Sequence, residues 1–277
     1  MTNEAPLSPS SSRRPPLLEG RVAVIAGVGR SLGRDVALAL ADHGADVVLG
    51  ARSDSVTNEV AAEVESRGRS ALSVRVDMGN VDDCQRLAAR AHERFGRIDA
   101  LINVAYVAPD LTTLETAQPD LSNWRPQFDM NVFGTLQTTK AVIPYMKAQG
   151  HGRIIMINSM ATELFSPGYA SYSGSKAALE AMTKTLALEL GPYGIRVNGI
   201  HPGYIDGGQM DYVMQRRAEA KGTTSEEVRA DVVSRLALGY MPHSSEHAGT
   251  VVFLVSDLSL PITGESIHVN AGQVSFD

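Results

Sequence analysis

Residues 22–51 read VAVIAGVGRSLGRDVALALADHGADVVLGA, and this stretch carries the strongest indication of the fold class. It holds an apolar run at 22–27, a glycine-rich turn, an alanine-rich amphipathic segment at 32–43 and a second apolar run at 45–51. Apolar runs without polar alternation are typical of strands that are buried on both faces of a parallel sheet. The stretch therefore predicts a β-α-β unit whose turn joins the first strand to the helix.

The same alternation continues along most of the chain. Further apolar, β-branched runs that predict strands lie at 71–77, 98–105, 153–159, 195–201 and 265–270. Amphipathic segments that predict helices lie at 55–67, 81–95, 128–148 and 171–190. This pattern predicts a doubly wound, Rossmann-type α/β domain with helices on both faces of the sheet. Ligands of such sheets lie beyond the carboxyl ends of the strands, so strand ends are the first candidates for a site.

Composition narrows the class of protein. With 43% hydrophobic residues and a net charge of -6, the chain can bury a large core and offers no basic stripe for nucleic acid. No apolar run reaches the roughly 18 to 20 residues of a membrane helix, and the first residues lack the apolar segment of a secretory signal. One cysteine, Cys84, excludes an internal disulfide and a thiolate metal cluster. We therefore expect a cytoplasmic protein that acts on a small molecule, with no nucleic-acid or membrane partner.

Two segments depart from the alternation. Residues 1–18 are rich in Ser and Pro and predict a flexible tail, which leaves 19–277 as one catalytic domain. Residues 204–243 read as two short helices separated by Gly222, the second opened by a capping box. The box would pair Thr224 with Glu227. Because this segment follows a strand end, it is a candidate substrate lid.

Tyr172 and Lys176 lie four residues apart at the start of the 171–190 helix, so both side chains fall on one face. An ammonium group beside a phenol favours the phenolate and is expected to lower its pKa from about 10. By itself this spacing more often marks a surface tyrosine beside a solvated lysine. Ser159 at a strand end and Asn131 on the preceding helix favour a functional site instead, because all four groups can converge on one carbonyl-sized site.

With several ordered motifs, these residues give the chain a resemblance to the short-chain dehydrogenase/reductase family, from residue 19 to 274. The motifs are the glycine-rich turn, Asp77, NVAY (103–106), MN (130–131), Ser159, YSGSK (172–176), HPGYID (201–206) and ITGESIHVNAG (262–272). The resemblance implies a parallel seven-stranded sheet in the order 3-2-1-4-5-6-7. It also implies an NAD(P)-dependent alcohol dehydrogenase or ketoreductase that forms a homotetramer or dimer, which the apolar faces of 128–148 and 171–190 permit.

The family's catalytic tetrad corresponds here to Asn131, Ser159, Tyr172 and Lys176. Tyr172 would exchange a proton with the substrate oxygen, and Ser159 would hydrogen-bond the same oxygen as its charge develops. Lys176 would hold the nicotinamide ribose and keep Tyr172 acidic, while Asn131 would position a water for proton relay. The hydride itself belongs to the cofactor.

The family's cofactor turn is T-G-x-x-x-G-x-G, and its fixed positions are Ala26, Gly27, Ser31 and Gly33 here. Gly27 would make the tight turn and Gly33 the close helix packing, while Ser31 would cap the helix or touch a phosphate. The residues that the resemblance places around the cofactor are Gly27, Arg30, Ser31, Leu32, Gly33, Arg52, Asp77, Met78, Asn103, Ala105, Tyr172, Lys176, Pro202, Gly203 and Ile205. No metal is expected.

The choice between NAD(H) and NADP(H) depends on the end of the second strand, where an NAD site usually has an acidic residue. Here Ala51 is followed by Arg52, and Arg30 lies in the glycine-rich turn. Two guanidiniums suit a 2′-phosphate, because Arg binds phosphate bidentately, so NADP(H) is favoured. In the alternative, Arg30 is solvated and Asp54 replaces the missing acid.

Other features leave alternatives open. A second hypothesis is a nicotinamide-binding sensor or scaffold subunit with little turnover. It is based on departures from the family pattern at Ser31, Val104, Tyr106 and Gly207. His243 and His247 have a spacing that can bind zinc, but Pro242 favours a helix start there. The lid has four cations that either bind an acidic substrate or form a solvated helix face, namely Arg216, Arg217, Lys221 and Arg229. Residues that predict a partly apolar, aromatic pocket are Met160, Phe165, Tyr169, Tyr204 and Met210.

Overall fold

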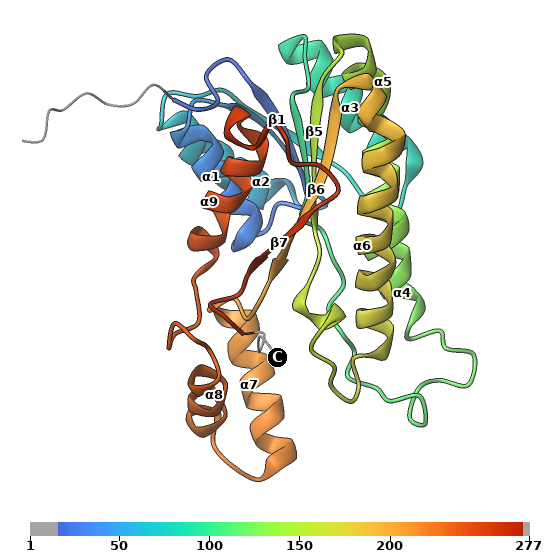
Figure 1. Ribbon diagram of the computed structural model, residues 1–277, viewed down its shortest axis with the longest axis vertical. Helices are drawn as coiled ribbons and strands as arrows, with labels where there is room; N and C mark the ends of the chain where they lie inside the picture. The colour runs from blue at the N-terminus through green and yellow to red at the C-terminus, as the bar shows by residue number, and fades with distance from the viewer. Residues whose placement is uncertain (1–15, 274–277) are drawn as a thin grey trace, which may run out of the picture.

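A parallel sheet runs through the centre of the protein, with helices on both faces, in a computed structural model that describes residues 16–273 apart from the side chains of Gln209 and Ala220 (Figure 1). Its strands are β1 (Val22–Ala26), β2 (Asp46–Ala51), β3 (Ala71–Arg75), β4 (Ala100–Asn103), β5 (Gly152–Ile157), β6 (Ile195–Pro202) and β7 (Ser266–Val269). The order β3-β2-β1-β4-β5-β6-β7 confirms the predicted topology. Residues of β1, β4 and β5 are buried throughout, as expected for strands covered on both faces.

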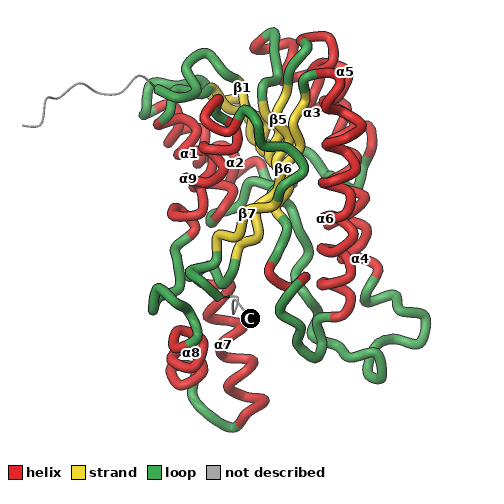
Figure 2. The backbone as a smooth tube through the Cα atoms, in the orientation of Figure 1, coloured by secondary structure: helices red, strands yellow, loops and turns green. Residues whose placement is uncertain are grey.

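The helices divide into two layers and a projecting pair. Their bounds are α1 (Leu32–Asp42), α2 (Asp54–Glu65), α3 (Val81–Phe95), α4 (Arg125–Phe128), α5 (Thr135–Gln149), α6 (Ala170–Leu190), α7 (Gly208–Lys221), α8 (Ser225–Ser234) and α9 (Ser244–Val255). One core cluster packs α1, α2 and α9 on one face of the sheet, and a second packs α3, α5 and α6 on the other. Helices α7 and α8 extend past the carboxyl ends of the strands, where loops also gather (Figures 1 and 2).

The amino-terminal boundary differs by at least one residue from the expected one. Most of the predicted tail, residues 1–15, lies outside the described residues. Leu18 is buried, at 1% exposure, and its N–H donates to the carbonyl of His43 at 2.8 Å. The folded domain therefore begins before residue 19, because Leu18 is part of the α1 core cluster. At the other end, residues 274–277 lie outside the described part. No helix in the described part is long and apolar enough to cross a membrane.

The predicted single helix over 128–148 is interrupted. A π-helical turn, Asp129–Gly134, separates α4 from α5 and places Asn131 at its centre. There the Asn131 side chain accepts from the N–H of Val107 at 2.7 Å and donates to its carbonyl at 3.2 Å. Single π turns inside helices are frequent at functional sites, because they redirect one side chain without ending the helix. Local periodicity did not reveal this turn, which coincides with contacts to a distant loop.

The lid is built as two short helices, as predicted, but its expected capping box is incomplete. Gly222 has φ +66 and ends α7, and the Thr224 hydroxyl accepts from the N–H of Glu227 at the start of α8. The Glu227 carboxylate, however, accepts from the Thr223 hydroxyl. At the start of α9 both halves of a cap are present, because the His243 ring accepts from the N–H of Ser245 at 3.3 Å and the Glu246 carboxylate accepts from the N–H of His243 at 2.8 Å.

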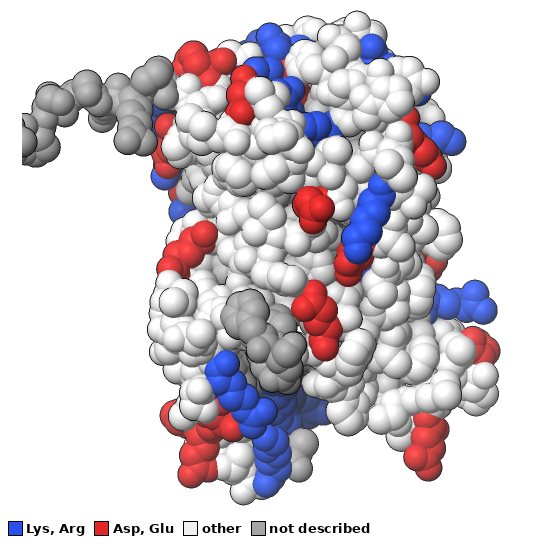
Figure 3. All heavy atoms as spheres, in the orientation of Figure 1, with Lys and Arg blue, Asp and Glu red and all other residues white. Residues whose placement is uncertain are grey.

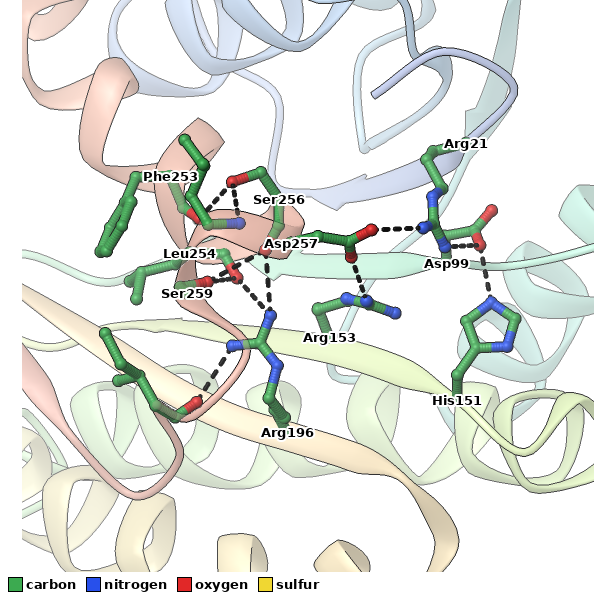
Figure 4. Close-up of polar contacts among 12 residues, drawn as sticks. Arg21, Asp99, His151, Arg153, Arg196, Phe253, Leu254, Ser256, Asp257 and Ser259 are labelled. Atoms are coloured by element: carbon green, nitrogen blue, oxygen red, sulfur yellow. Dashed lines mark hydrogen bonds and ion pairs between the residues drawn. The ribbon is translucent and has the colours of Figure 1, made fainter. Parts of the chain in front are cut away.

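An ion-pair network lies at the opposite end of the sheet from the lid (Figure 4). Asp99, buried just before β4, accepts from His151 at 2.8 Å and from Arg21 at 3.3 Å. Asp257 joins Arg21 to Arg153, at 3.2 and 2.7 Å. Burial opposes the charge on Asp99, but its hydrogen bonds lower the pKa of this carboxyl. These charges tie together the amino ends of the strands and leave the carboxyl ends to the site.

Candidate active site

A cleft of about 1940 Å³ opens at the carboxyl ends of the strands. Most residues predicted to bind the cofactor line it, namely Gly27, Arg30, Ser31, Leu32, Gly33, Arg52, Met78, Ala105, Tyr172, Lys176, Pro202, Gly203 and Ile205. Ser159 lines it as well, so three of the four predicted tetrad residues meet here. Asp77, Asn103 and Asn131 are not among the lining residues.

The glycine-rich turn needs glycine at two positions. Gly27 has φ +101, and a Cβ there would lie 2.2 Å from the backbone nitrogen of Ala105. A Cβ on Gly33 would lie 3.0 Å from the carbonyl oxygen of Gly27. A Cβ on Gly29, by contrast, would have no atom within 4 Å. The tight positions are therefore those of T-G-x-x-x-G-x-G, and the expected roles of Gly27 and Gly33 are confirmed.

Ser31 does not cap α1 through its side chain, contrary to one of the two expected roles. It occupies the N-cap position with φ -115 and ψ -121 and makes no side-chain cap hydrogen bond. An N-cap hydroxyl needs extended backbone to reach the N–H groups of the first turn, and this ψ lies outside that region. No side-chain cap therefore covers the amino end of α1 at the cleft, as a pyrophosphate site requires.

The two arginines at the adenosine end differ in their contacts. Arg30 donates to both carboxylate oxygens of Glu59, at 2.8 and 2.9 Å, so it is neither simply solvated nor unpaired. Arg52 is exposed and also lines the cleft. Asp77 is exposed, and its carboxylate accepts from the N–H of Gly79 at 2.9 Å. Asp54, the alternative acid, begins α2 and is not among the cleft-lining residues.

Tyr172 lies on the first turn of α6, opposite Ser159. The Ser159 side chain lies close enough to the phenol to oppose the effect of burial on the Tyr172 pKa, and its hydroxyl accepts from the N–H of Ala161 at 3.1 Å. The Tyr172 ring has edge contacts with Tyr106 and Tyr169, with centroids 6.5 and 6.3 Å away. A phenol and a hydroxyl thus lie side by side in an aromatic part of the cleft. This pair can bind one carbonyl oxygen from two directions.

Lys176 lies beneath Tyr172, one helical turn further along α6. It is 3% exposed, and its ammonium donates to the carbonyl oxygen of Ile157 at 2.7 Å. Burial lowers the pKa of Lys176 to about 7, and burial raises the pKa of Tyr172 above its ordinary value although the nearby Ser159 opposes this. The expected lowering of the Tyr172 pKa by Lys176 is therefore wrong for the protein without ligand. Desolvation of both groups outweighs their attraction.

The buried lysine makes stability depend on pH. Between pH 7 and pH 9, we expect the free energy of unfolding to rise by about 2 kcal/mol more in wild type than in Lys176→Met. The unfolded chain holds this proton up to the ordinary pKa of 10.5, whereas the folded chain releases it near 7, so the unfolded state binds more protons in this window. Denaturant titrations at pH 7, 8 and 9 measure the difference. Parallel curves for the two proteins would contradict it.

The two asparagines serve the scaffold. Asn103 is buried and its amide bonds the hydroxyls of Thr138 and Thr139, at 2.6 and 3.1 Å, so its side chain joins β4 to α5. Asn131 is fully buried and donates to Ser175 at 3.0 Å besides its bonds to Val107. Its side chain positions the loop after β4, and its expected part in a proton relay stays a prediction.

His201, the first residue of the HPGYID motif, lies behind the site and has a contact that the sequence did not reveal. It is 1% exposed, and its Nδ1 lies 3.0 Å from the carbonyl oxygen of Ser159. Burial lowers the pKa of His201, which favours the neutral ring. Behind it, Glu163 and His268 are in contact at 2.6 Å. The bond from His201 to Ser159 joins β6 to the end of β5, and such a long-range contact has no local signature in the chain.

The four lid cations do not behave alike. Arg216 pairs with Glu219 at 2.9 Å, Lys221 with Asp231 at 4.0 Å, and Arg229 with Asp206 at 2.7 Å. Arg217 donates instead to the hydroxyl of Tyr204, at 2.8 Å. Three of the four thus belong to ion pairs between lid residues, and Arg217 points to the cleft. His243 and His247, whose spacing can bind zinc, lie at the N-cap and in the first turn of α9.

Comparisons with known proteins agree with this geometry. A family model described as enoyl-(acyl carrier protein) reductase matches residues 27–273. The chain is 34% identical to the short-chain reductase protein NovJ of Streptomyces niveus, over 91% of this chain and 93% of that protein. It is also 34% identical to a 3-oxoacyl-[acyl-carrier-protein] reductase of Synechocystis sp., over 94% and 99%. The crystal structure of NAD+-bound xylitol dehydrogenase superposes with a TM-score of 0.87 at 29% identity, covering 92% of this chain and 99% of that one.

Proposed function

Because the chain belongs to the short-chain dehydrogenase/reductase family of nicotinamide-dependent oxidoreductases, we propose that it interconverts a ketone and a secondary alcohol with Tyr172 as acid and base. The observation that carries this proposal is that the Tyr172 phenol and the Ser159 hydroxyl line one cleft beside the buried Lys176. A phenol, a hydroxyl and a buried lysine at one point of a cleft large enough for a dinucleotide suit proton transfer to a carbonyl oxygen.

In the reducing direction, the Tyr172 hydroxyl donates its proton to the carbonyl oxygen of the substrate. The phenol carries this proton at neutral pH, because burial raises its pKa. The Ser159 hydroxyl donates to the same oxygen and stabilises the charge that develops there. His201 holds the backbone of Ser159 and so acts as a positioning residue. The nicotinamide, when bound, supplies or accepts the hydride.

The residues present fit a dinucleotide. Gly27 and Gly33 bring the backbone of the turn against its neighbours, and no side-chain cap covers the amino end of α1. These groups would hold the pyrophosphate. Lys176, whose ammonium is buried at the floor of the cleft, would hold the ribose hydroxyls next to the nicotinamide. Ile205 and Pro202, from the end of β6, would line its carboxamide side.

NADP(H) is the cofactor that we propose. Arg52 directly follows β2, where the ribose of the adenosine half lies in Rossmann folds, and it lines the cleft. Arg30, in the glycine-rich turn, is paired with Glu59. It can bind the phosphate together with Arg52 only when it leaves that pair. That pair is exposed on both sides, so a doubly charged phosphate can compete for the guanidinium at little cost.

The cofactor proposal predicts a selective effect at Arg52. In Arg52→Ala, we expect the dissociation constant for NADPH to rise by about tenfold and that for NADH by less than twofold, because the guanidinium meets only the 2′-phosphate. Titration of nicotinamide fluorescence measures both constants. Glu59→Gln is the matched variant, since it releases Arg30 and should strengthen NADPH binding alone. Equal effects of Arg52→Ala on both cofactors would refute the assignment.

A substrate panel tests the activity. Wild type should oxidise NADPH with at least one ketone of a panel of aliphatic, aromatic and charged members. The loss of NADPH absorbance measures this oxidation. Tight NADPH binding without turnover of any ketone would favour the alternative hypothesis of a sensor or scaffold subunit.

Homo-oligomer formation and a cytoplasmic location also stay predictions. Exposed Phe133 on the π turn and Leu188 on α6, at 56% and 80%, support a homotetramer or dimer.

A further inference from the structure

We propose that Arg217 binds an anionic group of the substrate, so that the preferred ketone carries a carboxylate, sulfate or phosphate at a distance from the reacting carbonyl. The inference rests on the proposed reductase function and names the substrate class of that site. It comes from the contacts and charge balance of the cleft.

Arg217 lies over the substrate end of the cleft. It projects from α7, half-buried, and donates to the Tyr204 hydroxyl at 2.8 Å and to the Tyr169 hydroxyl at 3.4 Å. Its guanidinium also lies 5.4 Å from the centre of the Tyr204 ring. Tyr169 in turn has an edge contact with Tyr172, at 6.3 Å. One aromatic ring therefore separates the Arg217 guanidinium from the proposed proton donor.

The charges that line the cleft are paired, with few exceptions. Its carboxylates contact other groups: Glu163 contacts His268, Asp206 contacts Arg229, and Asp231 contacts Arg235. Among cations of the described residues that line the cleft, those with no carboxylate within 4 Å are Lys176, Arg52 and Arg217. The first two belong to the proposed cofactor site. Arg217 is then the cation that remains for the substrate.

Neutral phenols are weak partners for a half-buried guanidinium. Tyr204 and Tyr169 accept hydrogen bonds from Arg217 and so position its guanidinium group. Neither phenol neutralises the positive charge of that group. A bidentate carboxylate or phosphate would supply the missing charge and the strongest hydrogen bonds an arginine can make. The space-filling view shows basic side chains over α7 on this face, with acidic side chains of the lid beside them (Figure 3).

The test pairs charged and neutral ketones. The probes are keto acids with two, four and six methylene groups between the carbonyl and the carboxylate, each beside its methyl ester. For wild type, we expect kcat/KM to favour the acid over its ester by about tenfold or more, chiefly through KM, and most for the longer spacers. In Arg217→Leu that preference should fall by about tenfold to hundredfold, and Arg217→Lys should recover part of it.

Controls separate Arg217 from its surroundings. Arg216→Leu is the matched variant, because it removes a cation from the neighbouring position that is already paired with Glu219, and it should change the acid-to-ester ratio by less than threefold. Tyr204→Phe removes the phenolic partner and should preserve the preference for acids. An Arg217→Leu protein that folds, reduces esters and keeps the full preference for acids would overturn the inference while leaving the proposed function intact.

A binding measurement tests the role of Arg217 without requiring turnover. The longest keto acid and its ester are titrated calorimetrically into wild type and Arg217→Leu, both saturated with NADP⁺ so that no reduction occurs. We expect the acid to bind wild type at least tenfold more tightly than it binds Arg217→Leu, with little change for the ester. If neither acids nor esters are reduced by NADPH, the proposed function fails and this titration still tests Arg217. Equal affinities of the acid for both proteins would then refute the inference.

Discussion

Tyr172→Phe should lower kcat for ketone reduction by about 10²- to 10⁴-fold, the usual contribution of a general acid. The substitution removes one oxygen and retains the ring, so the edge contacts with Tyr106 and Tyr169 persist. Steady-state and single-turnover oxidation of NADPH, with the best ketone of the panel, measures the loss. Because the hydroxyl acts on the substrate oxygen, the loss should appear in kcat as well as in kcat/KM.

The matched measurement for this variant is cofactor affinity. The dissociation constant for NADPH should change by less than about threefold, since the phenol contributes little to holding a dinucleotide. Ser159→Ala should give a smaller loss of kcat than Tyr172→Phe, because it removes one donor and leaves the proton source. A Tyr172→Phe protein that keeps a tenth or more of the wild-type kcat would exclude Tyr172 as the acid.

Gly27→Ala should cost about 3 kcal/mol or more in the free energy of unfolding. The residue has φ +101, where a side chain is strained, and the added methyl group would lie 2.2 Å from the Ala105 nitrogen. Ala105 is bonded to the carbonyl of Ala26 at 2.9 Å, so the obstacle is backbone that β1 and β4 hold in place. Relief requires the turn to separate from β4, which should also weaken NADPH binding by about tenfold or more.

Gly29→Ala is the control for this prediction. No atom lies within 4 Å of the added methyl group and φ is not positive, so the free energy of unfolding should change by less than about 1 kcal/mol. Urea denaturation of both variants gives the comparison, and fluorescence titration gives their NADPH affinities. Equal destabilisation by the two substitutions would show that the turn follows the G-x-G-x-x-G template, in which the second glycine is needed.

Much of the fold was predictable because its cause is local. Burial on both faces makes strands such as β1 and β5 uniformly apolar, and glycine requirements at Gly27 and Gly33 follow from a turn within one β-α-β unit. The spacing of Tyr172 and Lys176 is likewise a property of one helix. Predictions failed where a distant contact intervened. The π turn at Asn131 coincides with its bonds to Val107, and burial of Leu18 comes from packing on the α1 layer.

Electrostatics at the site depended on the folded environment. The expected lowering of the Tyr172 pKa assumed two solvated groups, whereas desolvation reverses the direction in the cleft. Similarly, Arg30 and Arg216 pair with Glu59 and Glu219, whereas the hydrogen-bond partners of Arg217 among residues 16–273 are the phenols of Tyr204 and Tyr169. The Arg216–Glu219 pair lies within one turn of α7, whereas the Arg30–Glu59 pair joins residues 29 apart and needs the folded chain.

The amino-acid sequence alone was sufficient for the sheet, its order, the glycine-rich turn, the family resemblance and three tetrad members that meet in the cleft. The strands, the helices and the turn arise from periodicity and spacing within short stretches of chain, whereas the sheet order and the tetrad came from the resemblance to the family. Folding in three dimensions was needed to bring His201 behind Ser159, to bury Lys176 and to leave Arg217 facing the cleft with neutral partners. Such features depend on desolvation and on contacts between distant residues, and neither is a property of any one segment.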